Sequence, residues 1–137
     1  MDKEFVPYQP SLDMKELGFD EPCFGSYVKL TETQNTFFMN DVVSEIDRET
    51  PLHESLITKA PTYSQGFRFF REKYGLFVAP NVISYEDGPY LWFFEINSTV
   101  SPFGTDLGGT DDFETYEEAE LACLIKLIEI VKRSKNE

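Results

Sequence analysis

The sequence predicts an α+β domain in which antiparallel hairpins pack against a long C-terminal helix, in the order α-β-β-α-β-β-α. Its 137 residues fall within the usual range for one domain, so we predict a single acidic domain over residues 1–137. Hydrophobic residues make up 41% and aromatic residues 15% of the chain, which is enough to fill a packed core. Turn signals separate short runs of β-formers, and residues 121–131 carry an apolar stripe at helical spacing.

The first predicted element is a helix around residues 11–17. Ser11 can cap it, because its hydroxyl can accept a hydrogen bond from an otherwise unpaired N–H of the first turn. Gly18 can end it in the left-handed conformation, after which Phe19 is expected to fold back on Met14.

A hairpin is predicted next. Short aromatic runs at residues 23–28 and 36–39 are separated by polar residues 31–35, a pattern typical of two strands with a loose turn. Residues 40–59 are acidic, irregular in pattern and interrupted by Pro51. We expect a long flexible loop there, with one helical turn as an alternative.

The second helix is predicted from its ends. Pro61 suits a first-turn position, Thr62 and Gln65 have the spacing of a capping box, and Gly75 ends the pattern. Four aromatic residues follow one another at helical spacing and are expected on one face: Tyr63, Phe67, Phe70 and Tyr74.

A second hairpin is predicted over residues 76–85 and 90–97, around the turn signal at residues 86–89. Both faces of its second run are largely apolar, which predicts a central strand covered on both sides. Residues 98–112 are predicted as a second flexible loop.

The last helix is predicted from Thr115, which has Glu118 at capping-box spacing, and from the cations at its C-terminal end, Lys132 and Arg133. Its apolar stripe consists of Leu121, Leu124, Ile125, Ile128 and Val131. One common core is expected to contain Phe67, Phe70, Trp92, Phe94, Leu124 and Ile128.

Charge limits the partners. The formal net charge is −13, with 25 acidic and 12 basic residues. Nucleic-acid backbones and anionic membranes repel such a protein, so we expect neither as a partner. A basic protein partner would be attracted, although the charge could also serve solubility alone. No segment is typical of a signal peptide or a membrane helix, and we expect a cytoplasmic protein with reduced, buried cysteines at 23 and 123.

The sequence contains few of the histidine and cysteine residues that commonly act in catalysis. His53 is the only histidine, and Cys23 and Cys123 lie in apolar contexts without metal-ligand spacing. No phosphate-binding loop is present, so no catalytic residue, cofactor or metal site is predicted. The best binding candidate is the acidic stretch between residues 101 and 120, which contains no Lys or Arg. Its candidate site residues are Asp106, Asp111, Asp112, Glu114 and Glu117. Oxygen-rich loops with glycine can bind Ca²⁺, but this stretch lacks the acid spacing of an EF-hand loop, so we favour a solvated loop leading into an acid-capped helix.

Three stretches carry a family resemblance: residues 16–24, residues 65–76 and residues 116–130. Together they resemble a family of small uncharacterised proteins encoded by phages and prophages of Bacteroides-group gut bacteria. The resemblance implies a phage origin and carries over no functional residue.

Our leading hypothesis is a non-catalytic interaction protein that binds and modulates a host or phage protein. A special version is mimicry of DNA by ordered carboxylates. The alternative from another class is a small-ligand-binding domain or minor enzyme with an aromatic-lined pocket.

Overall fold

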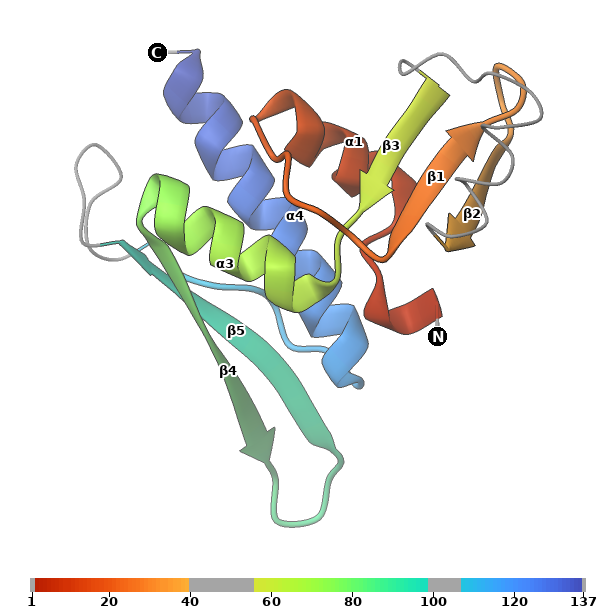
Figure 1. Ribbon diagram of the computed structural model, residues 1–137. Helices are drawn as coiled ribbons and strands as arrows, with labels where there is room; N and C mark the ends of the chain where they lie inside the picture. The colour runs from red at the N-terminus through yellow and green to blue at the C-terminus, as the bar shows by residue number, and fades with distance from the viewer. Residues whose placement is uncertain (1, 40–55, 99–106, 137) are drawn as a thin grey trace. The chain divides into compact units, whose positions relative to one another are not determined.

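Three α-helices, one short 3-10 helix and five strands are formed by the described residues of the computed structural model, which are 2–39, 56–98 and 107–136 (Figure 1). The chain divides into an N-terminal unit, Met1–Thr62, and a C-terminal unit, Tyr63–Glu137, each with its own antiparallel sheet. The predicted α+β class is confirmed, with one strand more than expected, in the order α-β-β-β-α-β-β-α. The units are described separately, and the prediction of a single domain stays a prediction.

The N-terminal unit opens with the 3-10 helix η1 (Asp2–Glu4) and helix α1 (Tyr8–Glu16). Helix α1 begins after Pro7, one turn before the predicted start, so the predicted cap at Ser11 is wrong. Ser11 is buried inside the helix, and its hydroxyl donates to the carbonyl oxygen of Val6 at 3.1 Å. Pro10 falls in the first turn, where its missing N–H would have no partner within the helix, so the earlier start sacrifices no hydrogen bond.

The end of α1 is as predicted. Gly18 has φ 103°, the left-handed conformation that glycine adopts without a Cβ clash. The N–H of Phe19 donates to the carbonyl oxygen of Met14 at 2.9 Å, and the N–H of Gly18 donates to that of Lys15 at 3.1 Å. These two bonds satisfy carbonyls that the helix end would leave unpaired, and Phe19 and Met14 are both buried.

The sheet of this unit has the order β2-β1-β3. Strand β1 (Gly25–Lys29) pairs antiparallel with β2 (Asn35–Met39), which confirms the first hairpin. Its other edge pairs antiparallel with β3 (Ile57–Ala60), so the predicted loop 40–59 is wrong at its C-terminal end. Four residues are too short a run to reveal a strand by their pattern, since its partner lies far away in the sequence. Residues 40–55, including the expected helical turn and His53, lie outside the described residues.

In the C-terminal unit, helix α3 (Tyr63–Tyr74) ends as predicted at Gly75, which has φ 67° and donates its N–H to the carbonyl oxygen of Arg71 at 3.1 Å. Its aromatic face is turned slightly from the prediction. The buried residues are Tyr63, Gly66, Phe69 and Phe70, whereas Phe67 and Tyr74 are half-buried. Helix α3 contacts β4 and α4.

The second hairpin is confirmed in full. Strands β4 (Leu76–Ser84) and β5 (Tyr90–Ser98) pair antiparallel from Leu76 opposite Ser98 to Ser84 opposite Tyr90. One face of β5 is buried through Phe94, Ile96 and Ser98. The expectation that both faces are covered is wrong, because Glu95 and Asn97 are exposed.

Helix α4 (Tyr116–Lys135) is the long C-terminal helix. Its cap is as predicted: the Thr115 hydroxyl accepts from the N–H of Glu118 at 3.2 Å and donates to the Glu118 carboxylate at 2.8 Å. Leu124, Ile128 and Val131 of the predicted stripe are buried, and the stripe also includes Ala119, Cys123 and Leu127. By contrast, Ile125 is 40% exposed and Leu121 is half-buried.

The predicted loop 98–112 is wrong in its described part, because residues 107–113 run antiparallel along the second edge of β5. Trp92 and Phe113 exchange two backbone hydrogen bonds of 2.7 and 2.8 Å. Further along, the N–H of Ile96 donates to the carbonyl oxygen of Gly108 at 2.9 Å. Strand β5 is therefore a central strand, paired on both edges.

The outer edge of β4 carries no strand in the described part of the chain. Pro80 lies in the middle of this edge, opposite Phe94. The backbone groups of Phe94 point to the other neighbour of β5, so by the alternation of an antiparallel ladder those of Pro80 point outward. The missing N–H of this proline therefore falls on the free edge, the position where a strand tolerates it.

Four of the six predicted core residues are buried, Phe70, Phe94, Leu124 and Ile128, whereas Phe67 and Trp92 are half-buried. Phe70 is 0% exposed. We expect Phe70→Ala to lower the free energy of unfolding by about 3–5 kcal/mol, because it removes apolar contacts and leaves a cavity. Urea unfolding followed by the fluorescence of Trp92, the one tryptophan, measures this. The control Phe77→Ala, at a 41% exposed site, should cost less than about 1 kcal/mol, and an equal loss in both variants would contradict the assignment.

Candidate protein-binding surface

The predicted acidic residues lie at the edge of β5 and at the start of α4. Asp111, Asp112, Glu114 and Glu117 are all exposed, and Asp106 lies outside the described residues. These acids are thus available to a partner without any rearrangement of the core.

The backbone pairing along β5 holds Asp111 and Asp112 in place. Thr110 on one side of them pairs with Phe94, and Phe113 on the other side pairs with Trp92. Phe94 donates its N–H to the Thr110 hydroxyl at 2.9 Å, so a side chain replaces the usual carbonyl acceptor. Between these two anchors the segment contains one residue more than β5 does, which is the arrangement of a β-bulge. The two aspartates form this bulge.

Glu114 directly precedes Thr115, the N-cap of α4, and Glu117 lies in the first turn of the helix. Acids near a helix N-terminus interact favourably with the helix dipole, so part of their role is structural. Glu117 has a further effect on its neighbour Glu120, which is half-buried. Burial, aided by the negative charge of Glu117, raises the pKa of Glu120 to about 7.

One feature that sequence reasoning missed is the extent of the acidic region. No Lys or Arg occurs between Lys73 and Lys126, whereas acids stand at ten positions, namely Glu86, Asp87, Glu95, Asp106, Asp111, Asp112, Glu114, Glu117, Glu118 and Glu120. The signal was present in the sequence, but only the sheet pairing shows that the hairpin and the acidic stretch are neighbours.

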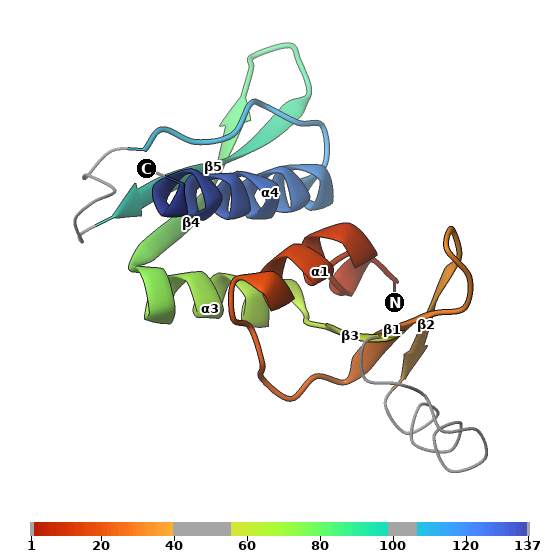
Figure 2. The same ribbon diagram turned by 90° about the horizontal axis from the view of Figure 1, so that it is seen from above.

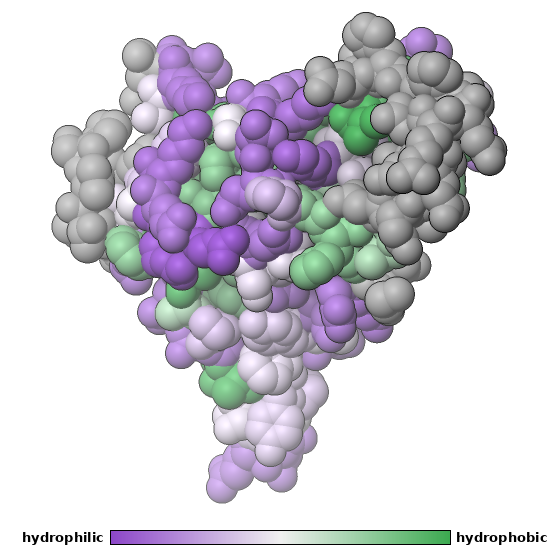
Figure 3. Space-filling view, in the orientation of Figure 1, coloured by the Kyte–Doolittle hydropathy of each residue, from purple (hydrophilic) through white to green (hydrophobic). Residues whose placement is uncertain are grey.

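The turn half of the hairpin, residues 80–92, forms a projection that we call the hairpin arm. No residue of the arm is buried, and its exposed apolar and aromatic side chains include Val82, Tyr85 and Tyr90, which are 50–67% exposed. The turn end of the arm lies beyond α3 and α4 in both views (Figures 1 and 2). Figure 3 shows the arm as mainly pale and green surface that ends in a purple tip. An exposed apolar surface rimmed by acids is typical of a protein-binding site.

The base of the arm is fixed by ring contacts with α4. The ring of Tyr116 lies 5.3 Å from that of Trp92, edge-on, and 5.6 Å from that of Phe94. Partial burial, with Glu120 nearby, raises the pKa of Tyr116. From the other side, the ammonium group of Lys126 on α4 donates to the carbonyl oxygen of Gly109. The segment that carries Asp111, Asp112 and Glu114, which we call the acidic edge, is therefore held against the base of the arm and α4.

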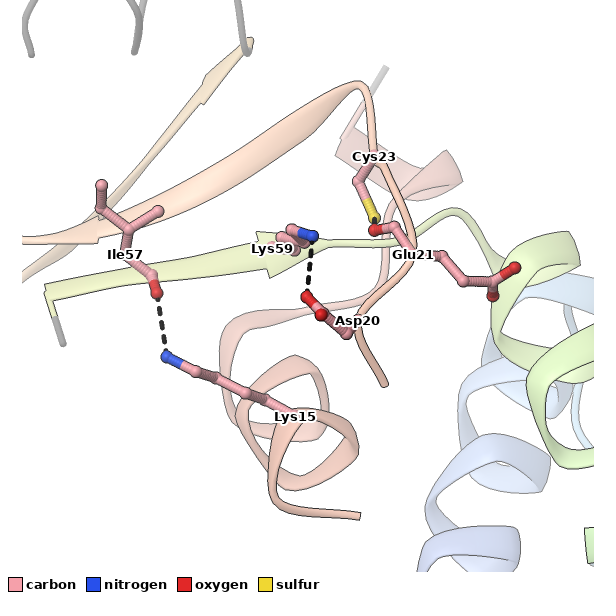
Figure 4. A network of polar contacts seen from close by, with 6 residues as sticks. All are labelled: Lys15, Asp20, Glu21, Cys23, Ile57 and Lys59. Atoms are coloured by element: carbon pink, nitrogen blue, oxygen red, sulfur yellow. Dashed lines mark hydrogen bonds and ion pairs between the residues drawn. The ribbon is translucent and has the colours of Figure 1, made fainter. Parts of the chain in front are cut away.

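Polar contacts in the N-terminal unit have a structural role (Figure 4). The ammonium group of Lys59 on β3 pairs with Asp20 at 3.0 Å, and that of Lys15 on α1 donates to the carbonyl oxygen of Ile57 at 3.1 Å. Both contacts attach β3 to α1 and the segment that follows it. They do not gather groups for acid–base chemistry.

Both cysteines are buried thiols, as predicted. Burial raises the pKa of Cys23 to about 11 and that of Cys123 to about 12, although Lys59 and Lys126 oppose the shift. The Cys23 thiol donates to the carbonyl oxygen of Glu21 at 3.4 Å. Reactive cysteines have lowered pKa values, so neither thiol is suited to act as a nucleophile.

Within residues 2–39, 56–98 and 107–136, no three His, Cys, Asp or Glu side chains are grouped so that they could hold a metal ion. Among the described residues, no helix combines the length and the apolar character that crossing a lipid bilayer requires.

Thiol labelling tests the assignment of the cysteines. Under native conditions we expect slow reaction with a disulfide reagent such as DTNB, because the thiols are buried and rarely ionised at neutral pH. On denaturation the protein should release two equivalents, one for each cysteine. Rapid labelling of the native protein would contradict the assignment, because it would show an accessible and reactive thiol.

The raised pKa of Glu120 predicts a pH-dependent stability. Burial in the folded protein raises the pKa of this carboxyl from 4.5 to about 7, so its ionised form opposes folding. This destabilisation is complete above pH 7 and disappears as the pH falls toward 4.5. Glu120→Gln cannot ionise, so its melting temperature should exceed that of the wild type most at pH 8 and least at pH 5. The exposed control Glu129→Gln should show no such trend in thermal melts, and a difference independent of pH for Glu120→Gln would refute the assignment.

Comparison with known proteins adds no relative to this picture. No protein-family model, no functionally characterised protein and no solved structure matches the chain. The phage-family resemblance therefore remains a prediction, and the function has to be argued from the surface of the chain itself.

Proposed function

We propose that this protein is a non-catalytic interaction module that binds a protein partner with a basic surface through the hairpin arm and the acidic edge beside it. The observation that carries the proposal is the juxtaposition of the two surfaces. Trp92, at the base of the arm, pairs with Phe113, which directly follows Asp111 and Asp112, and no Lys or Arg occurs in the sequence between Lys73 and Lys126.

The two surfaces have different roles in this proposal. Like charges gathered on one surface create a field that steers a cationic partner and raises the association rate. Apolar and aromatic side chains supply the contacts that stabilise a complex after encounter, since a few buried aromatic anchors provide most of the binding energy of an interface. Tyr85 and Tyr90 are the candidate anchors.

The resemblance to phage and prophage proteins suggests a partner encoded by the host or by the phage, and we propose the cytoplasm as the location. DNA mimicry is a special version of the same proposal, in which the partner is a DNA-binding protein. It requires carboxylates in rows at phosphate-like spacing. Asp111 and Asp112 lie beside β5, whereas Glu114 and Glu117 lie at the start of α4, so the four acids form no continuous row and the broader protein-binding proposal is preferred.

The alternative, a small-ligand-binding domain or minor enzyme, requires a pocket with converging polar groups. One pocket of about 530 Å³ lies along β5, and Glu95 is the one titratable side chain in its lining. A single carboxylate is insufficient for paired acid–base work, so an enzymatic function has less support than binding.

The test uses the variant Asp111→Lys, Asp112→Lys, Glu114→Lys. Wild-type protein first captures its partner from a lysate of a Bacteroides-group bacterium, the host that the resemblance implies. Stopped-flow then measures association of the purified partner at several salt concentrations. The triple reversal should slow association by about tenfold or more at low salt and flatten the salt dependence.

A matched control separates this surface from net charge. The triple reversal raises the formal charge from −13 to −7, two units at each of three positions. The same change at exposed acids elsewhere, Glu16→Lys, Glu72→Lys and Glu129→Lys, should slow association much less. If both triple variants slow association equally, net charge alone is responsible and the acidic edge has no specific role in binding. An association rate that changes neither with salt nor in either variant would refute the proposal.

A further inference from the structure

A pocket lies on the exposed face of β5. Phe93, Glu95 and Asn97 occupy alternate positions of the strand, so their side chains share one face. They line a pocket of about 530 Å³ whose other walls are formed by Phe94 and by residues 108–110. Glu95 is paired with Gly109, and because a Cβ at residue 109 would overlap the carbonyl oxygen of Phe94, glycine lets this wall of the pocket lie close against β5.

The core of the unit lies on the opposite face of β5. Phe94 and Ile96 are buried there, and the ring of Tyr116 from α4 packs on Phe94. Glu95 and Asn97 are exposed. The pocket is thus a surface feature that a partner could reach while the core stays intact.

The chemistry of the lining favours a cation. A phenyl ring attracts a positive charge over its face, a carboxylate forms charge-assisted hydrogen bonds with it, and an amide oxygen accepts further ones. Two other polar groups of the lining, one from a side chain and one from the backbone, already have hydrogen-bond partners within the protein. The Thr110 hydroxyl bonds Phe94 and Asp111, and the carbonyl oxygen of Gly109 accepts from Lys126.

The geometry points to a guanidinium group as the ligand: we propose that the pocket of Phe93, Glu95 and Asn97 receives an arginine side chain of the basic partner. This inference rests on the proposed function and names the contact within it. Arginine fits better than lysine because its flat group stacks on a ring while its edge donates to a carboxylate. Alternate side chains of a strand are about 7 Å apart, a separation that a long side chain lying along β5 can bridge.

The probe is N-acetyl-arginine methylamide, titrated into ¹⁵N-labelled protein and followed by NMR. We expect saturable shifts of the amide signals of Glu95, Asn97, Gly108 and Gly109. The citrulline analogue has the same shape without the charge and should produce much smaller shifts. The lysine analogue should bind more weakly than the arginine probe.

Two variants locate the site. Glu95→Gln removes the pocket carboxylate at an exposed position and should weaken binding of the arginine probe by about fivefold, the loss expected for a surface charge pair. Glu86→Gln removes an exposed acid in the hairpin turn and should leave binding unchanged. Phe93→Leu keeps an apolar side chain but removes the ring, and should also weaken it.

The proposal is overturned if the probe shifts the signals of all acidic residues alike, if citrulline binds as well as arginine, or if Glu95→Gln and Glu86→Gln behave identically. These outcomes are independent of the salt-dependent association measured with the acidic-edge reversal. If the arginine probe does not bind the pocket, the steering by Asp111 and Asp112 can still be measured. If no partner is captured from the lysate, the binding of the arginine probe can still be measured.

Discussion

The backbone hydrogen bonds on both edges of β5 are the constraint on which the C-terminal unit depends. The peptide groups of Phe94 and Ile96 lie in a buried part of the strand and must find partners. Strand β4 forms hydrogen bonds with one edge of β5, and the segment around Gly109 forms them with the other edge. The close approach requires glycine there, because a Cβ at residue 109 would overlap the carbonyl oxygen of Phe94. The acidic edge and the pocket both follow from this contact.

In the N-terminal unit, the central strand is also paired on both edges. Its central strand β1 pairs on one edge with its hairpin neighbour β2 and on the other with β3, which comes from farther along the chain. Val6 is tied to the end of β3, because its N–H donates to the carbonyl oxygen of Pro61 at 2.9 Å. Its own carbonyl oxygen accepts from the hydroxyls of Ser11 and Tyr27. In each unit, a hairpin covers one edge of the central strand and a segment from later in the chain covers the other.

This division explains what the sequence could predict. Hairpins and helix ends depend on neighbouring residues, so turn glycines, the Thr115 cap and the stop at Gly18 were visible in the pattern. The second partners of the central strands are distant in sequence, and their own patterns are weak. In the segment beside β5, the Thr110 hydroxyl takes the place of a backbone acceptor, and the bulge at Asp111 and Asp112 interrupts the alternation of polar and apolar residues that would predict a strand. Of the candidate acids, Asp111, Asp112, Glu114 and Glu117 are exposed, but the place of the two aspartates beside β5 depends on the register of the pairing, which the sequence pattern does not reveal.

Pro80 has a consequence for how the arm behaves in a crowded cell. A free strand edge next to apolar side chains invites other chains to add to it, which is the first step of many aggregates. At the centre of β4 this edge offers a carbonyl oxygen and no donor, so an incoming strand finds no continuous ladder. Recognition must then depend on side chains, which differ between partners, instead of on backbone groups, which are common to all proteins. Pro80 thus allows the arm to expose apolar side chains and still bind partners selectively.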